Sequence, residues 1–275
     1  MTSKLIPSNP SEVMVIRKLL PDIVTMSTPF ARFGYLKFGG RGTIVRMQSG
    51  ALSVFSPVAL TPEVKTTVES LGGNVKYIAA PDMEHHIFLT PWKEAYPNAE
   101  IIAPEGLREK REQNPETKGL DFAHIFTTQK NKEAIKVSEE FDAEFETEYV
   151  HSHPSKDLVF LHKPSKTLIE ADMLFNLPAT EQYSKTGVAA DSGFLTRMIM
   201  PLQSTKAPAT WHQRFLWYII SAKDQKGFAE SAKRIDKWDF DRLIPCHGDV
   251  IETGAKDVFR RVFAWYLDGA HKKSD

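Results

Sequence analysis

The sequence has few of the features that would quickly assign a chain to a class of protein. It contains one cysteine, Cys246, in 275 residues, so no disulfide can form within the chain. We therefore expect a reducing, cytoplasmic location and a small buried apolar role for that thiol. Lys and Arg together number 35, as do Asp and Glu. This balance gives no general attraction for nucleic acid or for an anionic membrane.

Long apolar runs, internal repeats and a serine-hydrolase motif are also missing. No uncharged stretch reaches the roughly 20 residues that span a bilayer, and residues 1–7 lack the apolar core of a signal peptide. There is no Gly-x-Ser-x-Gly sequence, so a serine nucleophile is not supported. We expect a small-molecule substrate, with no nucleic-acid or membrane partner; the oligomeric state is left open.

What is present is an ordinary globular composition, 41% hydrophobic and 25% charged. We predict one domain over residues 13–267, after a flexible N-terminus (1–12) and before a tail (268–275), with an aperiodic insertion near the site at 176–210. Apolar and alternating runs predict strands at 13–16, 23–26, 35–38, 43–47, 52–55, 75–79, 101–103, 144–150, 158–162, 167–170 and 242–245. Helices are predicted at 62–71, 91–96, 104–113, 211–221, 225–238 and 255–267, and residues 114–133 are predicted to be irregular.

A Gly-Gly-Arg-Gly run at residues 39–42 lies between two of the predicted strands. We interpret it as a turn. A phosphate-binding loop is the alternative, but such a loop opens a helix, and no helix start follows this one.

The chemically richest stretch is the loop that follows the predicted strand 75–79. Two carboxylates and two imidazoles occur within five residues, as Asp82, Glu84, His85 and His86. Oxygen and nitrogen donors at this density are typical of a site for zinc, iron or manganese. A polar surface turn is the alternative.

Further donors follow later strands in the same way. His151 and His153 come after the strand at 144–150, Asp172 after 167–170, and His247 after 242–245. Strand ends at one edge of a sheet can converge in space although they are far apart in sequence. Imidazoles and carboxylates that meet there would hold a divalent ion, which lowers the pKa of bound water.

The order and spacing of these donors resemble the metallo-β-lactamase superfamily. The segments 79–85, 165–172 and 238–248 are each similar to a divergent branch classed only as a domain of unknown function. The resemblance covers residues 13–267. It implies an α+β fold, an αββα four-layer sandwich with a metal site at one edge.

The resemblance also implies roles for single residues. The positions that match usual metal ligands are those of His85, His153, Asp172 and His247. Three positions of the first motif are altered, where Ala80, Asp82 and Glu84 stand for His, His and Asp. We therefore expect one tight metal site and a second that is weak or absent. Either acidic residue of the altered motif would bind the ion or orient a histidine that does.

These observations lead to one function hypothesis and two alternatives. The leading hypothesis is a hydrolase of a small ester, lactone, thioester or amide that uses metal-activated water, most simply with zinc. The expected metal ligands are His85, His153, Asp172, His247 and Glu84. The expected catalytic residues are Asp172, Asp82 and Glu84, and the expected substrate contacts are His86, His151 and His212. The alternatives are an iron-containing redox or oxygen-using enzyme and a non-catalytic binding protein with an eroded site.

Overall fold

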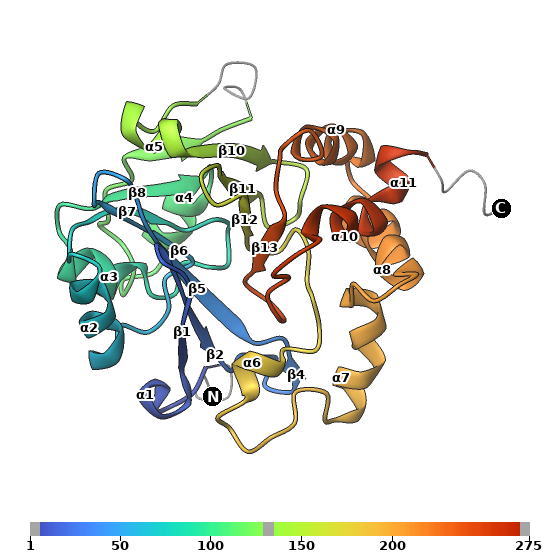
Figure 1. The fold of residues 1–275 in the computed structure, drawn as a ribbon, viewed down its shortest axis with the longest axis horizontal. Helices are drawn as coiled ribbons and strands as arrows, with labels where there is room; N and C mark the ends of the chain where they lie inside the picture. The colour runs from blue at the N-terminus through green and yellow to red at the C-terminus, as the bar shows by residue number, and fades with distance from the viewer. Residues whose placement is uncertain (1–5, 129–134, 270–275) are drawn as a thin grey trace.

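Two β-sheets packed face to face form the centre of the molecule, and helices cover the outer face of each sheet (Figure 1). The computed structural model describes residues 6–128 and 135–269. The predicted αββα four-layer sandwich is confirmed. Within the described residues, no helix combines the length and apolar character needed to cross a membrane.

The larger sheet has seven strands and changes from antiparallel to parallel pairing partway across. In sheet order they are β1 (Val15–Leu20), β2 (Ile23–Thr28), β5 (Gly40–Arg46), β6 (Leu52–Phe55), β7 (Val75–Ala79), β8 (Glu100–Pro104) and β9 (His124–Phe126). Pairing is parallel from β6 to β9. Parallel neighbours need crossover connections, which here contain the helices α2 (Pro62–Ser70), α3 (Leu89–Ala95) and α4 (Leu107–Glu112).

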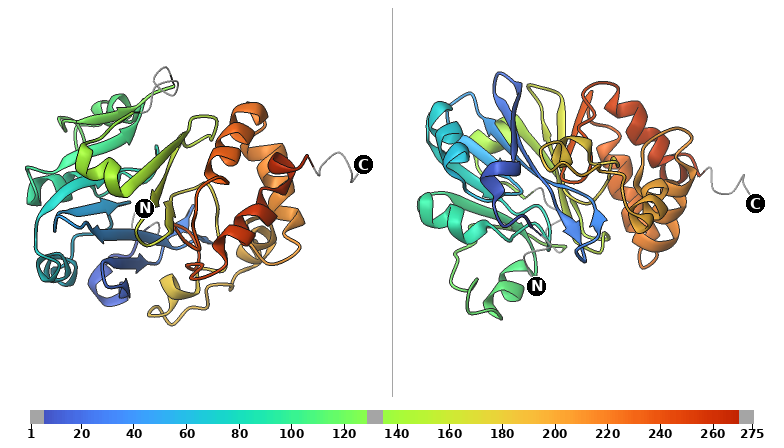
Figure 2. Two further views of the ribbon diagram at one scale, coloured as in Figure 1. Left: turned by 45° about the horizontal axis from the view of Figure 1, so that its top comes forward. Right: turned by 90° about the horizontal axis from the view of Figure 1, so that it is seen from below.

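The smaller sheet has four strands, and the C-terminal helices cover it. The strands are β10 (Phe145–Val150), β11 (Asp157–His162), β12 (Thr167–Glu170) and β13 (Arg242–Pro245). The helices are α8 (Thr210–Phe215), the π-helix η4 (Leu216–Ile220), α9 (Gln225–Ile235), α10 (Ala255–Val262) and α11 (Ala264–Leu267). Figure 2 shows these orange and red helices gathered on the side away from the blue and green sheet.

The central strands are buried on both faces because each sheet lies between the other sheet and a helical layer. In β7, Tyr77 packs between the sheets while Ile78 packs in the core of the larger sheet's helices. In β11, Phe160 packs between the sheets and Val159 packs in the core of the C-terminal helices. Successive strand residues point to opposite faces, so such strands are continuous apolar runs. That is the pattern by which the sequence predicts them.

The remaining elements are short and lie around this core. They are α1 (Pro10–Val13), the hairpin strands β3 (Ala31–Arg32) and β4 (Leu36–Lys37), α5 (Glu139–Glu144), α6 (Thr180–Tyr183), α7 (Phe194–Ile199) and the 3₁₀ helix η3 (Met200–Gln203). The hairpin and the segment after β12 share a small core that includes Leu36, Phe38, Leu177 and Tyr183. In Figure 1, α6 and α7 accordingly lie near β4.

Several local predictions are wrong. Residues 114–133 were expected to be irregular, but they contain β9; positions 129–133 lie outside the described residues. The aperiodic stretch 176–210 contains α6, α7 and η3, and α5 was not predicted. The turn predicted at 39–42 is confined to Gly39, with φ +68°, and β5 begins at the next residue. The predicted strand at 13–16 begins only at Val15, because Val13 ends α1. The predicted flexible termini fall partly on residues 1–5 and 270–275, outside the described residues.

Candidate metal centre

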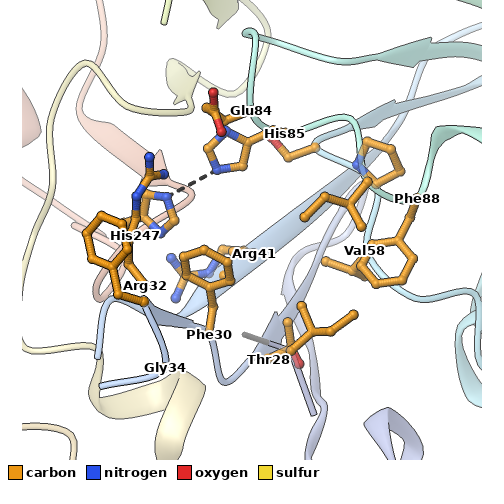
Figure 3. A pocket seen from close by; sticks show the side chains of 16 residues that line it. Thr28, Phe30, Arg32, Gly34, Arg41, Val58, Glu84, His85, Phe88 and His247 are labelled. Carbon is orange, nitrogen blue, oxygen red and sulfur yellow. Dashed lines mark hydrogen bonds between the residues drawn. The ribbon is translucent and has the colours of Figure 1, made fainter. Parts of the chain in front are cut away.

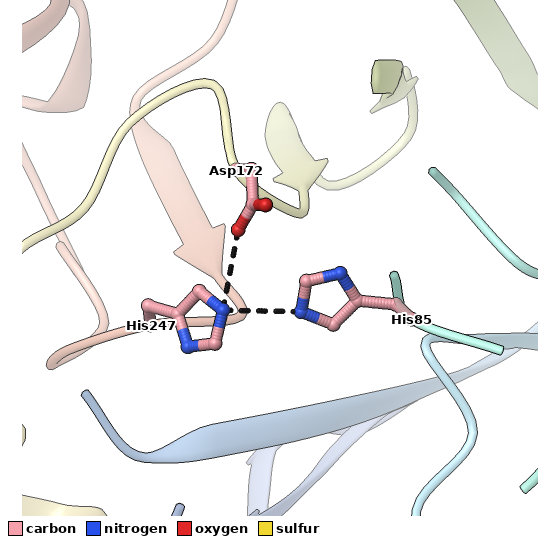
Figure 4. Close-up of side chains that lie close together, drawn as sticks. All are labelled: His85, Asp172 and His247. Atoms are coloured by element: carbon pink, nitrogen blue, oxygen red, sulfur yellow. Dashed lines mark hydrogen bonds and ion pairs between the residues drawn. The ribbon is translucent and has the colours of Figure 1, made fainter. Parts of the chain in front are cut away.

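Three donor side chains meet where strands of both sheets end (Figure 4). His85 lies in the loop after β7, Asp172 follows β12, and His247 follows β13. Because β12 and β13 run parallel, their carboxyl ends lie side by side. One donor atom from each of the three residues lies within 4.8 Å of the other two. Strands far apart in sequence thus bring three of the predicted metal ligands together.

His247 is the central member of this cluster. Its Nε2 lies 3.2 Å from His85 Nε2 and 3.2 Å from Asp172 Oδ1. Its Nδ1 lies 2.6 Å from the carbonyl oxygen of Gly39. A carbonyl oxygen can only accept a hydrogen bond, so a neutral His247 carries its proton on Nδ1. Its Nε2 therefore presents a lone pair to the other two donors.

His85 is held in the same way by Asp82. The Nδ1 of His85 lies 2.9 Å from Asp82 Oδ1, which also accepts the backbone N–H groups of Glu84 at 2.8 Å and His85 at 2.7 Å. The Asp82 side chain is fully buried. Because this carboxylate accepts from Nδ1, the Nε2 of a neutral His85 is unprotonated and points at the cluster. A carboxylate that orients a histidine in this way is common behind metal ligands.

The donor set fits a divalent cation. Two imidazole lone pairs and a carboxylate oxygen face one another, and a cation between them removes their mutual repulsion. Tetrahedral zinc with ligands at about 2.0–2.2 Å holds its donors about 3.4 Å apart, close to the 3.2 Å separations found here. Asp172 Oδ1 is also buried without a hydrogen-bond donor among the described residues. Buried oxygens in that state are rare and call for a partner.

The surrounding charges also favour a cation. Burial alone would lower the pKa of His85, but the Asp82 carboxylate, with Asp172 and Asp157 beyond it, raises that pKa to about 9. Burial would raise the pKa of Asp172, but the imidazoles of His247 and His85 hold it well below its usual range. The nearby carboxylates therefore favour positive charge at the cluster, and a proton competes with a metal ion for His85 Nε2.

Two cavities meet at the cluster, since His247 lines both. The larger has a volume of about 800 Å³ and also reaches His85 (Figure 3). Its walls are mostly apolar and include Phe30, Phe33, Pro57, Val58, Ile87 and Phe88. The smaller, of about 250 Å³, lies on the Asp172 side. A concave apolar cavity with a few converging polar groups is typical of a small-molecule site.

Two further histidines follow β10, and the structure separates them. His153 is buried and lines the smaller cavity; its Nδ1 accepts the Ser155 N–H at 3.2 Å, and its Nε2 has no hydrogen-bond partner among the described residues. His151 lines neither cavity, and its Nε2 lies 3.6 Å from Asp224 Oδ2. His153 is thus beside the cluster without joining its closest three donors, while His151, expected to contact substrate, lies away from both cavities.

The other two histidines expected to contact substrate also differ in position. His212 is buried in α8 and lines the smaller cavity, with Nδ1 donating to the Ser204 carbonyl at 3.3 Å. His86 lines neither cavity. Its ring and its carbonyl oxygen both contact Arg111 Nη1, at 3.1 and 2.8 Å. His86 therefore fixes its loop to α4, and His212 alone of these predicted contacts faces a cavity.

The two acidic residues of the first loop have different environments. The Glu84 side chain is 44% exposed, lies 3.1 Å from Lys110 Nζ, and lines the larger cavity. Asp82 is covered, and in the described part of the chain its hydrogen-bond donors all come from its own loop. Neither carboxylate belongs to the three-donor cluster. The sequence did not decide which of the two acids orients a histidine, and in the structure it is Asp82, which contacts His85 Nδ1. Glu84 lines the larger cavity, where a ligand can reach it.

Asp157 is a buried residue of the site that the sequence analysis did not single out. It is the first residue of β11, and its Oδ2 accepts the Asp172 N–H at 2.8 Å. Burial, with the nearby Asp82 and Asp172 carboxylates, raises its pKa well above the usual value. Ser155 adds a hydrogen bond to Asp172 Oδ2 at 3.1 Å. A single Asp at a strand start gives no sequence signal of this role.

Arg41 was missed for a similar reason. It is a fully buried arginine in β5 whose Nη1 donates to the carbonyls of Pro245 at 2.7 Å and Gly248 at 2.6 Å. These two carbonyls flank His247 in the chain. In sequence Arg41 belongs to the Gly-rich run that was interpreted as a turn, so its burial was not expected.

The buried imidazole of His212 predicts a loss of stability in mild acid. Burial lowers its pKa to about 4, against 6.5 for an exposed histidine. Between these values the unfolded chain binds a proton that the folded chain does not, so stability falls as pH decreases from about 6.5 to about 4. By pH 5 the loss from this residue alone reaches about 2 kcal/mol.

Urea unfolding of metal-free protein at pH 7 and pH 5 measures this loss. In His212→Gln the part of the loss that is due to His212 should vanish. Gln213→Ala, a change at the next residue of α8 that removes no titratable group, should keep the native dependence of stability on pH. If His212→Gln lost as much free energy of unfolding between pH 7 and pH 5 as the native protein does, the prediction would be contradicted.

Comparison with known proteins assigns the chain to a family. Residues 32–188, more than half of the chain, match the family described as a domain of unknown function, DUF4336. No protein among the curated ones matches the sequence. Among solved structures, a metallo-β-lactamase from Pontibacter korlensis is 11% identical, with a TM-score of 0.56 over 93% of this chain and 99% of that one. The metallo-β-lactamase DIM-1 is 12% identical, with a TM-score of 0.55 over 93% and 98%.

A flavo di-iron protein from Thermotoga maritima, solved as a point mutant, is similar as well. It is 12% identical, with a TM-score of 0.60 over 92% of this chain but only 62% of that one. At these identities the likeness concerns the fold. The chain has the metallo-β-lactamase fold, and it belongs to the DUF4336 family.

Proposed function

We propose that the protein is a metal-dependent hydrolase of a small molecule. The observation that carries the proposal is the meeting of His85, Asp172 and His247, whose donor atoms lie within 4.8 Å of one another beside a largely apolar cavity of about 800 Å³. Bound divalent ions lower the pKa of water and polarise carbonyl oxygens. Esters, lactones, thioesters and amides all need both effects, so each is a candidate substrate class.

The protein's own residues have distinct parts in this proposal. His85, Asp172 and His247 would hold the ion. Asp82 and the Gly39 carbonyl fix the two imidazoles with Nε2 toward the cluster. The apolar walls of the larger cavity bind the substrate and exclude water from its far end.

Glu84 is the proposed proton acceptor, because its carboxylate lines the same cavity as His85 and is open to solvent. A carboxylate in that position can take a proton from the reacting water and release it to the bulk.

Metal analysis and hydrolysis assays test the proposal together. We expect one tightly held divalent ion per chain after purification without added metal, zinc most simply, and loss of ester or thioester hydrolysis when a chelator removes it. Two tight equivalents would contradict the single-site proposal. Bound iron with oxygen consumption would favour the redox alternative. A chain that takes up no metal and unfolds at the same temperature with or without zinc would favour a binding protein, since a ligand of the native state raises stability.

Two isosteric substitutions should separate the roles of the neighbouring acids. Asp82→Asn removes the charge that orients His85, and we expect zinc affinity to fall about 10- to 100-fold. Glu84→Gln should leave zinc affinity unchanged but reduce kcat about 100-fold or more, as loss of a proton acceptor does. Competition with a chromophoric chelator measures affinity, and steady-state kinetics on the metal-loaded proteins measures kcat. The reverse pattern would exchange the two assignments.

A further inference from the structure

Arg32 is a cation at the candidate site, and no anionic side chain within residues 6–128 and 135–269 pairs with it. It belongs to β3 and lines both cavities, as His247 does. In Figure 3 it is drawn on the same side of the larger cavity as His247. Among the described residues, no carboxylate or carbonyl oxygen bonds its guanidinium, which instead lies over the Phe33 ring, 5.6 Å from the ring centroid.

The other charged groups of the larger cavity are already engaged. Arg41 donates to backbone carbonyls beneath the cluster. Glu84 lies 3.1 Å from Lys110 Nζ, and His85 lies 2.9 Å from Asp82 Oδ1. Among the described residues that line this cavity, Arg32 is therefore the charged group free to bind a ligand. A guanidinium presents a planar fork of donors that matches a carboxylate in a bidentate pair.

The other residues of the larger cavity determine which kind of group can accompany the bound anion. Its apolar walls offer few hydrogen bonds, so the body of a bound molecule must itself be apolar. One guanidinium balances one negative charge, which favours a monoanionic carboxylate over a phosphate dianion. Because Arg32 and His247 line the same cavities, the anion and the reacting bond would lie close together in the substrate.

We propose that the substrate of this site is a carboxylate with an apolar body, and that Arg32 binds the carboxylate. As a statement about substrate the inference rests on the proposed hydrolase function. The recognition of the anion does not, because it needs neither the metal ion nor a reaction. Binding to metal-free protein therefore tests Arg32 separately from the chemistry.

The test compares 4-phenylbutyrate with its neutral amide, 4-phenylbutyramide, by calorimetric titration of metal-free protein near neutral pH. The two probes share the apolar body and differ in charge. We expect the acid to bind about tenfold more tightly, as a charged hydrogen-bonded pair implies. Arg32→Gln should abolish the preference and leave amide binding unchanged. Arg214→Gln is the matched control, since Arg214 also lies over an aromatic ring, Trp211, but lines neither cavity.

The outcomes are distinct. Equal affinity for the two probes in the native protein, a preference that survives in Arg32→Gln, or no binding of either probe at millimolar concentration would each overturn the proposal. If the preference holds but the protein takes up no metal, the anion site stands and the hydrolase function fails. If both hold, Arg32→Gln should raise KM for carboxylate-bearing esters about tenfold, without raising KM for their methyl-capped analogues.

Discussion

Replacing His247 with alanine is expected to abolish metal retention while the fold persists. His247 Nε2 is the atom that both other donors approach at 3.2 Å, so its removal leaves His85 and Asp172 without their shared neighbour. We expect zinc affinity to fall by more than about 100-fold, beyond the loss seen when only an orienting residue is changed. Asp172→Asn should have a similar effect, because it removes the anionic donor of the three-residue cluster.

Metal content after equilibrium dialysis measures this loss, and thermal unfolding of metal-free samples checks the fold. His124→Ala is the matched control: its Nε2 lies 2.6 Å from Glu100 Oε2, so it is also a histidine paired with a carboxylate, but it lies outside the cluster. With zinc in large excess, the native protein and the control should unfold at a higher temperature than without it. Zinc at a hundred times its Kd adds about 3 kcal/mol to the free energy of unfolding. His247→Ala should not. Stoichiometric metal in both His247→Ala and Asp172→Asn would end the case for this site.

The sequence predicts the fold best where burial leaves a local pattern. Strands such as β7 and β11 are apolar on both faces, and they are identified from composition alone. Elements such as β9 and α5 were missed because they are short and their form depends on neighbours distant in sequence. Within residues 176–210, Leu177 and Tyr183 share a small core with the β3–β4 hairpin, a tertiary contact that periodicity does not reveal.

The sequence predicts those residues of the candidate site whose positions are determined by the ends of strands. His85, Asp172 and His247 each follow a strand, and the shared edge of the sheets brings them together. Which of two nearby carboxylates serves the cluster depends instead on the loop conformation. Asp82 is held inward because its Oδ1 accepts the N–H groups of Glu84 and His85, a local turn that leaves the Glu84 side chain outside. The backbone conformation of the loop therefore determines which carboxylate contacts His85, and residue type alone does not predict it.

The second large effect is expected from Arg41→Met, a substitution beneath the site. The methionine cannot donate to the carbonyls of Pro245 and Gly248, which would remain buried without their present donor. Arg41 Nη2 also lies 3.5 Å from Glu181 Oε1, but that carboxylate keeps a second cation, because Arg17 Nε lies 2.8 Å from its Oε2. With two carbonyls at about 1–3 kcal/mol each, we expect a loss of about 3 kcal/mol in the free energy of unfolding. Urea unfolding of metal-free protein measures it, with Arg46→Met, an exposed change in the same strand, as control.

The same substitution should also weaken metal binding, because the two carbonyls that Arg41 holds lie on either side of His247. We expect zinc affinity to fall about tenfold or more, as with other residues that position a ligand. A loss of stability alone does not produce this effect. Phe259→Ala, in the core of the C-terminal helices, should lower stability by a comparable amount and leave zinc affinity unchanged. If both variants lost stability but Arg41→Met bound zinc as the native protein does, Arg41 would stabilise the fold without positioning His247. If zinc affinity fell in Arg41→Met but not in the Phe259 variant, Arg41 would be shown to position His247 for metal binding.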